Sequence, residues 1–91
     1  MNAYIGLIRK EQKSDYGVEF PDFPGCITAA KSLSEAQMMA QEALNAHIEF
    51  MAEDGEVLPE PSSLEEIMAK KNSKGAVAIV VNAINPYAVK W

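Results

Sequence analysis

Alternating apolar and polar positions in the first third of the chain predict three short β-strands. Residues 3–10 are rich in aliphatic and β-branched side chains, and every second side chain of residues 16–20 is apolar or aromatic. A third apolar run covers residues 26–31. The polar residues 11–15 and the proline-rich residues 21–25 separate the runs. Because these connections are short, we expect an antiparallel meander.

A helical period begins after Ser32. The sequence Ser32-Leu-Ser-Glu35 is a capping box, in which the serine hydroxyl and the glutamate carboxylate satisfy backbone amides at a helix start. Apolar residues then recur at helical spacing and form one stripe, which we expect to face the sheet. The stripe contains Leu33, Ala36, Ala40, Ala43, Leu44, His47, Phe50 and Met51. Asp54-Gly55 predicts the end of this helix through a left-handed cap.

The last third of the chain predicts a connector, a short helix and a fourth strand. Residues 58–63 are stiffened by prolines, and Ser63-Leu-Glu-Glu66 is a second capping box that opens a helix over residues 64–70. Residues 76–84 are almost continuously apolar, which is typical of a strand buried on both faces. A right-handed crossover would place this strand parallel to the first.

The predicted fold class is therefore α+β, with the element order β-β-β-α-(short α)-β. It combines an antiparallel three-stranded meander, a fourth strand, and one main helix packed on one face of the sheet. Ninety-one residues suit a single domain, which we assign to residues 1–84, and residues 85–91 form a C-terminal tail.

Composition and charge narrow the function classes. The single cysteine excludes an internal disulfide and a zinc site built on paired cysteines. No basic segment precedes the first apolar run, and the longest apolar run, residues 76–81, is too short to span a membrane. We therefore expect a cytoplasmic protein.

The formal net charge is −5, and residues 32–69 contain nine acids and no lysine or arginine. This disfavours nucleic acid and favours a basic protein as the partner, although a solvated acidic face is the simpler alternative.

The residues that could carry chemistry favour binding over catalysis. His47 lies within the apolar stripe, where a core histidine is the usual role, and Cys26 has no activating base or cation beside it in the sequence. The first strand supplies no acid for a two-metal site. We predict no catalytic, cofactor-binding or metal-binding residues, and no enzymatic activity.

Two sets of residues are candidates for protein contacts. Asp15, Glu19 and Asp22 flank Phe23, which we expect to be exposed, and acids around an aromatic side chain suit a basic partner. The alternative is ordinary turn polarity with Phe23 folded inward. Met38 lies on the polar face of the main helix and Ile48 near its edge, so both are candidates for an oligomer contact.

The segment Glu19-Phe-Pro-Asp-Phe-Pro-Gly-Cys-Ile-Thr28, followed by a capped helix with Glu35-Ala36 and Glu42-Ala43, resembles the HicB antitoxin domain. The similarity covers about residues 3–84 and implies a partial ribonuclease H-like fold. It also implies that the domain binds and silences a small basic ribonuclease toxin called HicA. This chain has Ala29-Ala-Lys31 where the family pattern leads us to expect a glycine and an acid.

Family members commonly carry a second, C-terminal DNA-binding domain, and the resemblance therefore implies DNA binding only through a domain absent from this chain. Our first hypothesis is an antitoxin that covers the RNA-binding and catalytic face of a HicA-like toxin, as a homo-oligomer (dimer or tetramer). One alternative is a ligand-sensing or scaffold module without a toxin partner. Another is a small metal-dependent nuclease, which the acid-free first strand argues against.

Overall fold

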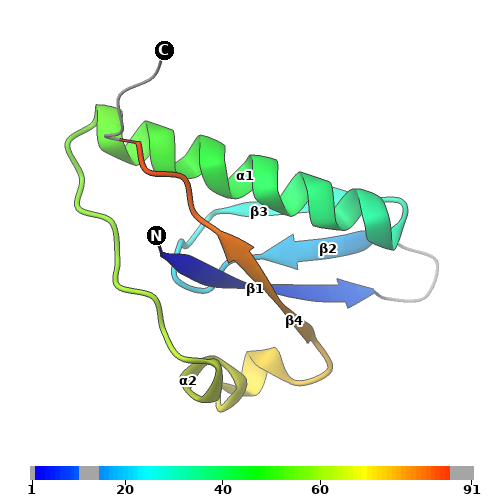
Figure 1. Cartoon of the computed structure of the whole chain (residues 1–91). Coiled ribbons are helices and arrows are strands. Elements are labelled where there is room, and N and C mark those ends of the chain that lie inside the picture. Colours follow the sequence, from blue (N-terminus) through cyan, green and yellow to red (C-terminus); the bar gives the residue numbers. More distant parts are fainter. Residues whose placement is uncertain (1, 11–14, 87–91) are drawn as a thin grey trace.

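The computed structural model describes residues 2–10 and 15–86, and within them it confirms the predicted order of elements (Figure 1). The elements are β1 (Ala3–Lys10), β2 (Tyr16–Glu19), β3 (Ile27–Ala30), α1 (Leu33–Glu53), α2 (Leu64–Met68), the 3-10 turn η1 (Lys71–Ser73) and β4 (Val77–Asn82). Most of the predicted turn at residues 11–15 and most of the predicted tail lie outside the described residues. Among those described, no helix is long and apolar enough to cross a lipid bilayer.

The four strands form one sheet in the order β3-β2-β1-β4, and every neighbouring pair is antiparallel. The meander prediction is confirmed, but the prediction of a parallel fourth strand is wrong. The handedness rule applies when one helix returns the chain to the same end of a sheet. Here an extended connector and α2 follow α1 and carry the chain across once more, so Val77 of β4 enters opposite Ile8 at the far end of β1.

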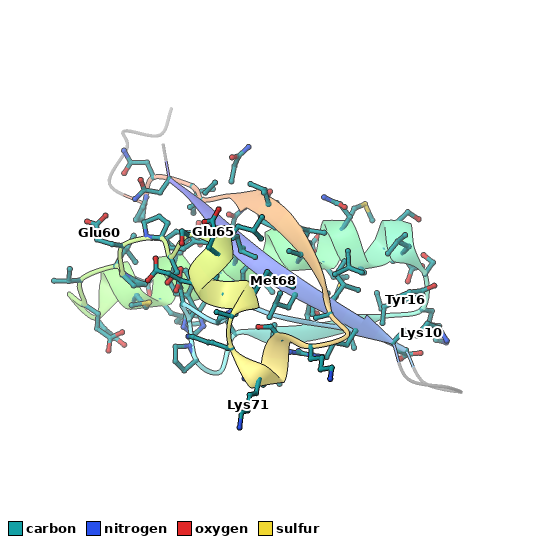
Figure 2. The ribbon with its side chains drawn as sticks, turned by 90° about the horizontal axis from the view of Figure 1, so that it is seen from below. Lys10, Tyr16, Glu60, Glu65, Met68 and Lys71 are labelled. Carbon is teal, nitrogen blue, oxygen red and sulfur yellow. The ribbon has the colours of Figure 1, made fainter. Side chains whose placement is uncertain are left out.

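Side chains of β1 alternate between two faces that are both covered. Tyr4 and Ile8 join the main core beneath α1, whereas Ile5 and Leu7 pack with Ile67 of α2 on the opposite face. Figure 2, seen from the α2 side, shows this short helix lying across β1. The main helix covers one face as predicted, and α2 covers part of the other.

The prediction that β4 is buried on both faces is wrong. Val77 is 64% exposed and Val80 is 69% exposed, while Val81 is buried. The cause is position, since β4 is an edge strand and α2 is only five residues long. Its apolar composition therefore does not reflect burial in this chain.

The buried stripe of α1 differs from the predicted one. The fully buried positions recur every fourth residue, at Ala36, Ala40, Leu44 and Ile48. Leu33 and Phe50, which the predicted stripe included, are 58% and 68% exposed. At 3.6 residues per turn, Phe50 lies about 160° around the helix from Ile48, so the two side chains cannot both face the sheet.

Helix ends follow the predicted capping chemistry. The Ser32 hydroxyl accepts the Glu35 N–H (3.2 Å), although the Glu35 carboxylate accepts from Lys31 N–H and not from Ser32. Gly55 has φ of +74°, and its N–H donates to the Ala52 carbonyl, which confirms the left-handed end of α1.

At the start of α2, Ser63 and Glu66 exchange both bonds of a capping box at 3.1 Å. The hydrogen bond from the Ser63 backbone N–H, with a smaller contribution from the Ser63 side chain, holds the pKa of the Glu66 carboxyl below its usual value.

A close contact lies at the centre of the sheet, where the sequence places a glycine within a strand. A Cβ atom on Gly6 would lie 3.2 Å from the ring of Phe20 and 3.3 Å from the side chain of Ile79. The Phe20 ring therefore packs close against the β1 backbone, and only a glycine at position 6 leaves room for this contact.

Candidate functional site

The proline turn after β2 directs Phe23 into the core. Phe23 N–H donates to the Phe20 carbonyl, and Cys26 N–H donates to the Phe23 carbonyl, both at 2.9 Å. The Phe23 ring is 2% exposed and stands edge-on to Tyr4 (4.6 Å) and His47 (5.6 Å). The expectation of an exposed Phe23 is wrong, and the alternative of an inward-folded ring is correct. His47 is half-buried, and its ring contacts the core residue Phe23.

Asp22 holds the connector that follows α1. Its carboxylate accepts from the Ser62 backbone N–H (2.8 Å) and from the Ser62 hydroxyl (2.6 Å). Nearby, the Tyr4 hydroxyl donates to the Pro59 carbonyl (2.5 Å), and burial raises the pKa of this hydroxyl. The hydrogen bonds of Asp22 and Tyr4 therefore hold the connector, an otherwise extended segment, against the sheet.

Replacing Asp22 by alanine should lower the free energy of unfolding by about 1.5–3 kcal/mol, because two hydrogen bonds to one carboxylate are lost. Urea denaturation followed by circular dichroism measures this change. Limited proteolysis should cut the variant faster within residues 56–61, since the Ser62 anchor is gone. Asp54→Ala, at an exposed position that ends α1, is the matched control and should change stability by less than about 0.5 kcal/mol.

Cationic side chains lie close to the Glu19 carboxylate and balance its negative charge. The Arg9 guanidinium donates both to the Glu19 carboxylate and to the Asn72 carbonyl. A pocket of about 180 Å³ opens beside it, lined by Glu19, the proline turn, Lys70 and Asn72. Two cations therefore accompany this acid, which weakens its attraction for a basic partner.

Asp15 lies just before Tyr16 at the start of β2, whereas Glu19 is the last residue of this strand, so the structure does not bring these two acids together around Phe23. Whether Asp15, Glu19 or Asp22 contacts a partner stays a prediction.

Cys26 is a buried packing residue. The side chain is 4% exposed, and its thiol donates to the Ala43 carbonyl of α1 at 3.6 Å. Burial raises the pKa of the Cys26 thiol, which lowers the thiolate fraction at neutral pH. Within the part of the chain that the structure describes, no three His, Cys, Asp or Glu side chains gather closely enough to hold a metal ion.

The outer side of α1 carries the most concentrated charge. Glu35, Glu42, Glu49 and Glu53 are exposed there, and we call these four residues the acidic face of α1. Met38 is 62% exposed beside them, as predicted for an oligomer contact, and that role stays a prediction. Ile48 is fully buried, so the expectation of a contact at the helix edge is wrong. It belongs to the four-residue repeat that faces the sheet.

Phe50 is the exposed aromatic residue that the sequence interpretation missed. It borders a shallow hollow together with Ala46, Glu49 and Glu53, so acids flank an aromatic ring on α1 and not at Phe23. A signal was present in the sequence. The strict four-residue repeat from Ala36 to Ile48 identifies the buried side, and Phe50 falls outside it.

Comparison with known proteins identifies the family to which this fold belongs. The model of the family described as "HicB_like antitoxin of bacterial toxin-antitoxin system" matches residues 4–90. The chain belongs to the HicB-like antitoxins. The resemblance seen in the sequence is thus confirmed, together with the predicted α+β fold class.

Solved structures share the fold of this HicB-like antitoxin. The antitoxin HicB of Burkholderia pseudomallei superposes with a TM-score of 0.81 at 32% identity, over 90% of this chain and 63% of that one. A chain of the HicA3 and HicB3 toxin-antitoxin complex superposes with a TM-score of 0.74 over 92% of this chain and all of that one. At 24% identity, this second likeness concerns the fold alone.

A relative from Haemophilus phage HP1 is named as an uncharacterized 14.9 kDa protein in the rep-hol intergenic region. It is 42% identical over 67 residues, which cover 74% of this chain and 50% of the phage protein. The HicB-like antitoxin described here therefore spans about half the length of that relative.

Proposed function

We propose that this chain binds and neutralises a small basic ribonuclease toxin of the HicA type, and does so by contact alone. The observation that carries the proposal is the match of residues 4–90 to the HicB-like antitoxins. The fold shared with a chain of the HicA3 and HicB3 complex supports a HicA-type partner.

The acidic face of α1 supplies the chemistry for this contact. A ribonuclease binds the phosphates of RNA with cations, and carboxylates on a rigid helix complement the same cations. Residues 32–69 contain no lysine or arginine that would repel them. A helix of 21 residues is about 30 Å long, a span that suits an interface of roughly 800 Å² per partner.

Phe50 is the proposed apolar anchor within this charged surface. Interfaces gain most of their binding energy from a few buried side chains, often aromatic, that polar residues surround. Phe50 is 68% exposed between Glu49 and Glu53 in the isolated chain, so a partner can bury it. Mechanistically, the antitoxin would cover the RNA-binding and catalytic face of the toxin and exclude the substrate.

The direct test mixes the purified chain with a small basic ribonuclease toxin of the HicA type. We expect a stable complex, and we expect RNA cleavage by the toxin to stop once the antitoxin is in molar excess. A toxin that keeps its full activity, with no complex by size-exclusion chromatography, would favour the ligand-sensing or scaffold alternative. RNA cleavage by the chain alone with Mg²⁺ or Mn²⁺ would favour the nuclease alternative.

A further inference from the structure

Within the described residues, the outer edge of β4 leaves the backbone groups of Ala78 and Val80 without a partner strand. Ala83 N–H donates to the Asn2 carbonyl at 2.8 Å, so the backbone of Ala83 faces β1. Because N–H and C=O groups alternate in direction along a strand, the backbones of Ala78, Val80 and Asn82 face away from β1. Among residues 2–10 and 15–86 no strand lies on that side, since β4 ends the sheet (Figure 2).

This edge lacks the devices that usually block strand pairing. Edge strands are commonly protected by charges, prolines, bulges or short length. β4 is six residues long, pairs with β1 without interruption from Val77 to Asn82, and contains no charged residue or proline. The other edge strand, β3, is four residues long and is followed directly by Lys31. The two edges therefore differ in their capacity to accept another strand.

We propose that two copies of this chain pair antiparallel through β4, with the two-fold axis at Ile79, to form one continuous eight-stranded sheet. Charge favours this surface for self-association. Each copy carries a net charge of −5, so a contact through the acidic face of α1 would be repulsive, whereas residues 75–86 carry no charge.

The register about Ile79 follows from the bonding groups that remain. In it Ala78 lies opposite Val80 of the second copy, and the two exchange both backbone hydrogen bonds, which gives four such bonds per dimer. On the α1 face Val77 meets Val81 of the second copy, and on the α2 face Val80 meets Ala78. Both valines exposed on β4 are thereby covered.

The residues at the two ends of the paired strands are also compatible with this register. Asn82 of one copy lies opposite Ala76 of the other. The Asn82 carbonyl already accepts from the Gln41 amide (2.7 Å), and Ala76 N–H already donates to the Ser73 carbonyl (3.1 Å). The two groups that would face each other there are satisfied within each copy. A register centred on Val80 instead places Ala78 N–H against the carbonyl that Gln41 occupies.

The first test measures the oligomeric state by sedimentation velocity over a range of concentrations. We expect a dimer of twice the 9.9 kDa chain mass. Val80→Pro removes an N–H that faces away from β1, a position where an edge strand tolerates proline. It should raise the dimer dissociation constant about 100-fold, because two inter-copy bonds are lost and their acceptors are left unpaired.

Two further variants keep this test decisive if Val80→Pro folds poorly. Val80→Lys places a charge on each side of the two-fold axis and should give a monomer with unchanged circular dichroism. Ile27→Lys is the matched control, since Ile27 is 70% exposed on the same face of the sheet at the β3 edge. It should leave the dimer intact. A wild-type chain that stays monomeric, or a dimer that survives Val80→Lys, overturns the proposal.

The second test fixes the register. Residues at a non-hydrogen-bonded antiparallel pair have Cα atoms about 4.5 Å apart, so Ile79→Cys should form a disulfide-linked dimer under mild oxidation. In the same register the two Val80 residues are diagonal neighbours about 7–8 Å apart, beyond the usual reach of a disulfide. Efficient cross-linking through Val80→Cys and not through Ile79→Cys would overturn the Ile79 register.

A toxin strand is the competing occupant of this edge. If the chain alone is monomeric and Val80→Lys weakens toxin binding, β4 serves the toxin and the self-pairing proposal is wrong. If Val80→Lys abolishes the dimer and leaves a one-to-one toxin complex intact, self-pairing holds and is separate from neutralisation. The result therefore distinguishes failure of this inference from failure of the proposed function.

Discussion

Phe23→Ala should lower the free energy of unfolding by about 3–4 kcal/mol, the range for removal of a buried phenylalanine. The ring is 2% exposed and contacts Tyr4 and His47 edge-on, so its loss leaves a cavity between the sheet and α1. A domain of this size has a total stability of about 5–15 kcal/mol, and the change is therefore a large fraction of it. Urea denaturation should give a lower midpoint with the same slope.

Phe50→Ala is the matched control, because it makes the same chemical change on an exposed surface. Phe50 is 68% exposed, so its replacement should shift stability by less than about 0.5 kcal/mol. Toxin affinity should respond in the opposite order, with the larger loss for Phe50→Ala when both variants are folded. Equal stability of the wild type and the Phe23 variant would contradict the buried placement of that ring.

Reversing three charges on the acidic face of α1 should slow toxin association about 100-fold at low salt, within the range known for electrostatic steering. The variant is Glu42→Lys with Glu49→Lys and Glu53→Lys. Each reversal adds two positive charges, so the net charge changes from −5 to +1. Stopped-flow or surface-binding kinetics measure the rate, and the difference from wild type should shrink at high ionic strength because salt screens the attraction.

A second triple variant separates local charge from net charge. Glu56→Lys, Glu60→Lys and Glu65→Lys produce the same net charge from exposed acids on the connector and α2. Glu65 belongs to α2, which lies on the opposite side of the sheet from α1 (Figure 1), and Figure 2 labels both Glu60 and Glu65. We expect a much smaller effect on the association rate. Equal losses in the two triple variants would mean that overall charge, and not the α1 surface, attracts the toxin.

Local patterns predicted the elements, because local chemistry decides them. Capping serines, Gly55 and the proline turn act within a few residues. The boundaries of the predicted helices and strands lie within about two residues of their predicted positions, whereas the 3-10 turn η1 was not predicted. The direction of β4 could not be predicted the same way. It depends on the path of residues 54–76 around the end of the sheet, which no local pattern encodes.

The candidate site was predicted less well, since exposure depends on packing between distant elements. Phe23 sits in a polar turn, yet backbone bonds to Phe20 and Cys26 turn its ring inward. Asp22 has the sequence signature of a surface acid, yet Ser62, forty residues later, occupies its carboxylate. The acidic segment at residues 32–69 was visible in the sequence because charge there is nearly uniform. Helical spacing also places Glu35, Glu42, Glu49 and Glu53 on the side of the helix opposite its apolar stripe.

The strand order determines how late in synthesis the sheet can be completed. β1 is made first and lies in the middle of the sheet, but its neighbour β4 is made last. At about 5–20 residues per second, roughly 4–14 seconds separate the two strands on the ribosome. During that interval Ile5 and Leu7 have neither α2 nor β4 to cover them. The sheet therefore remains incomplete until nearly every described residue has left the exit tunnel.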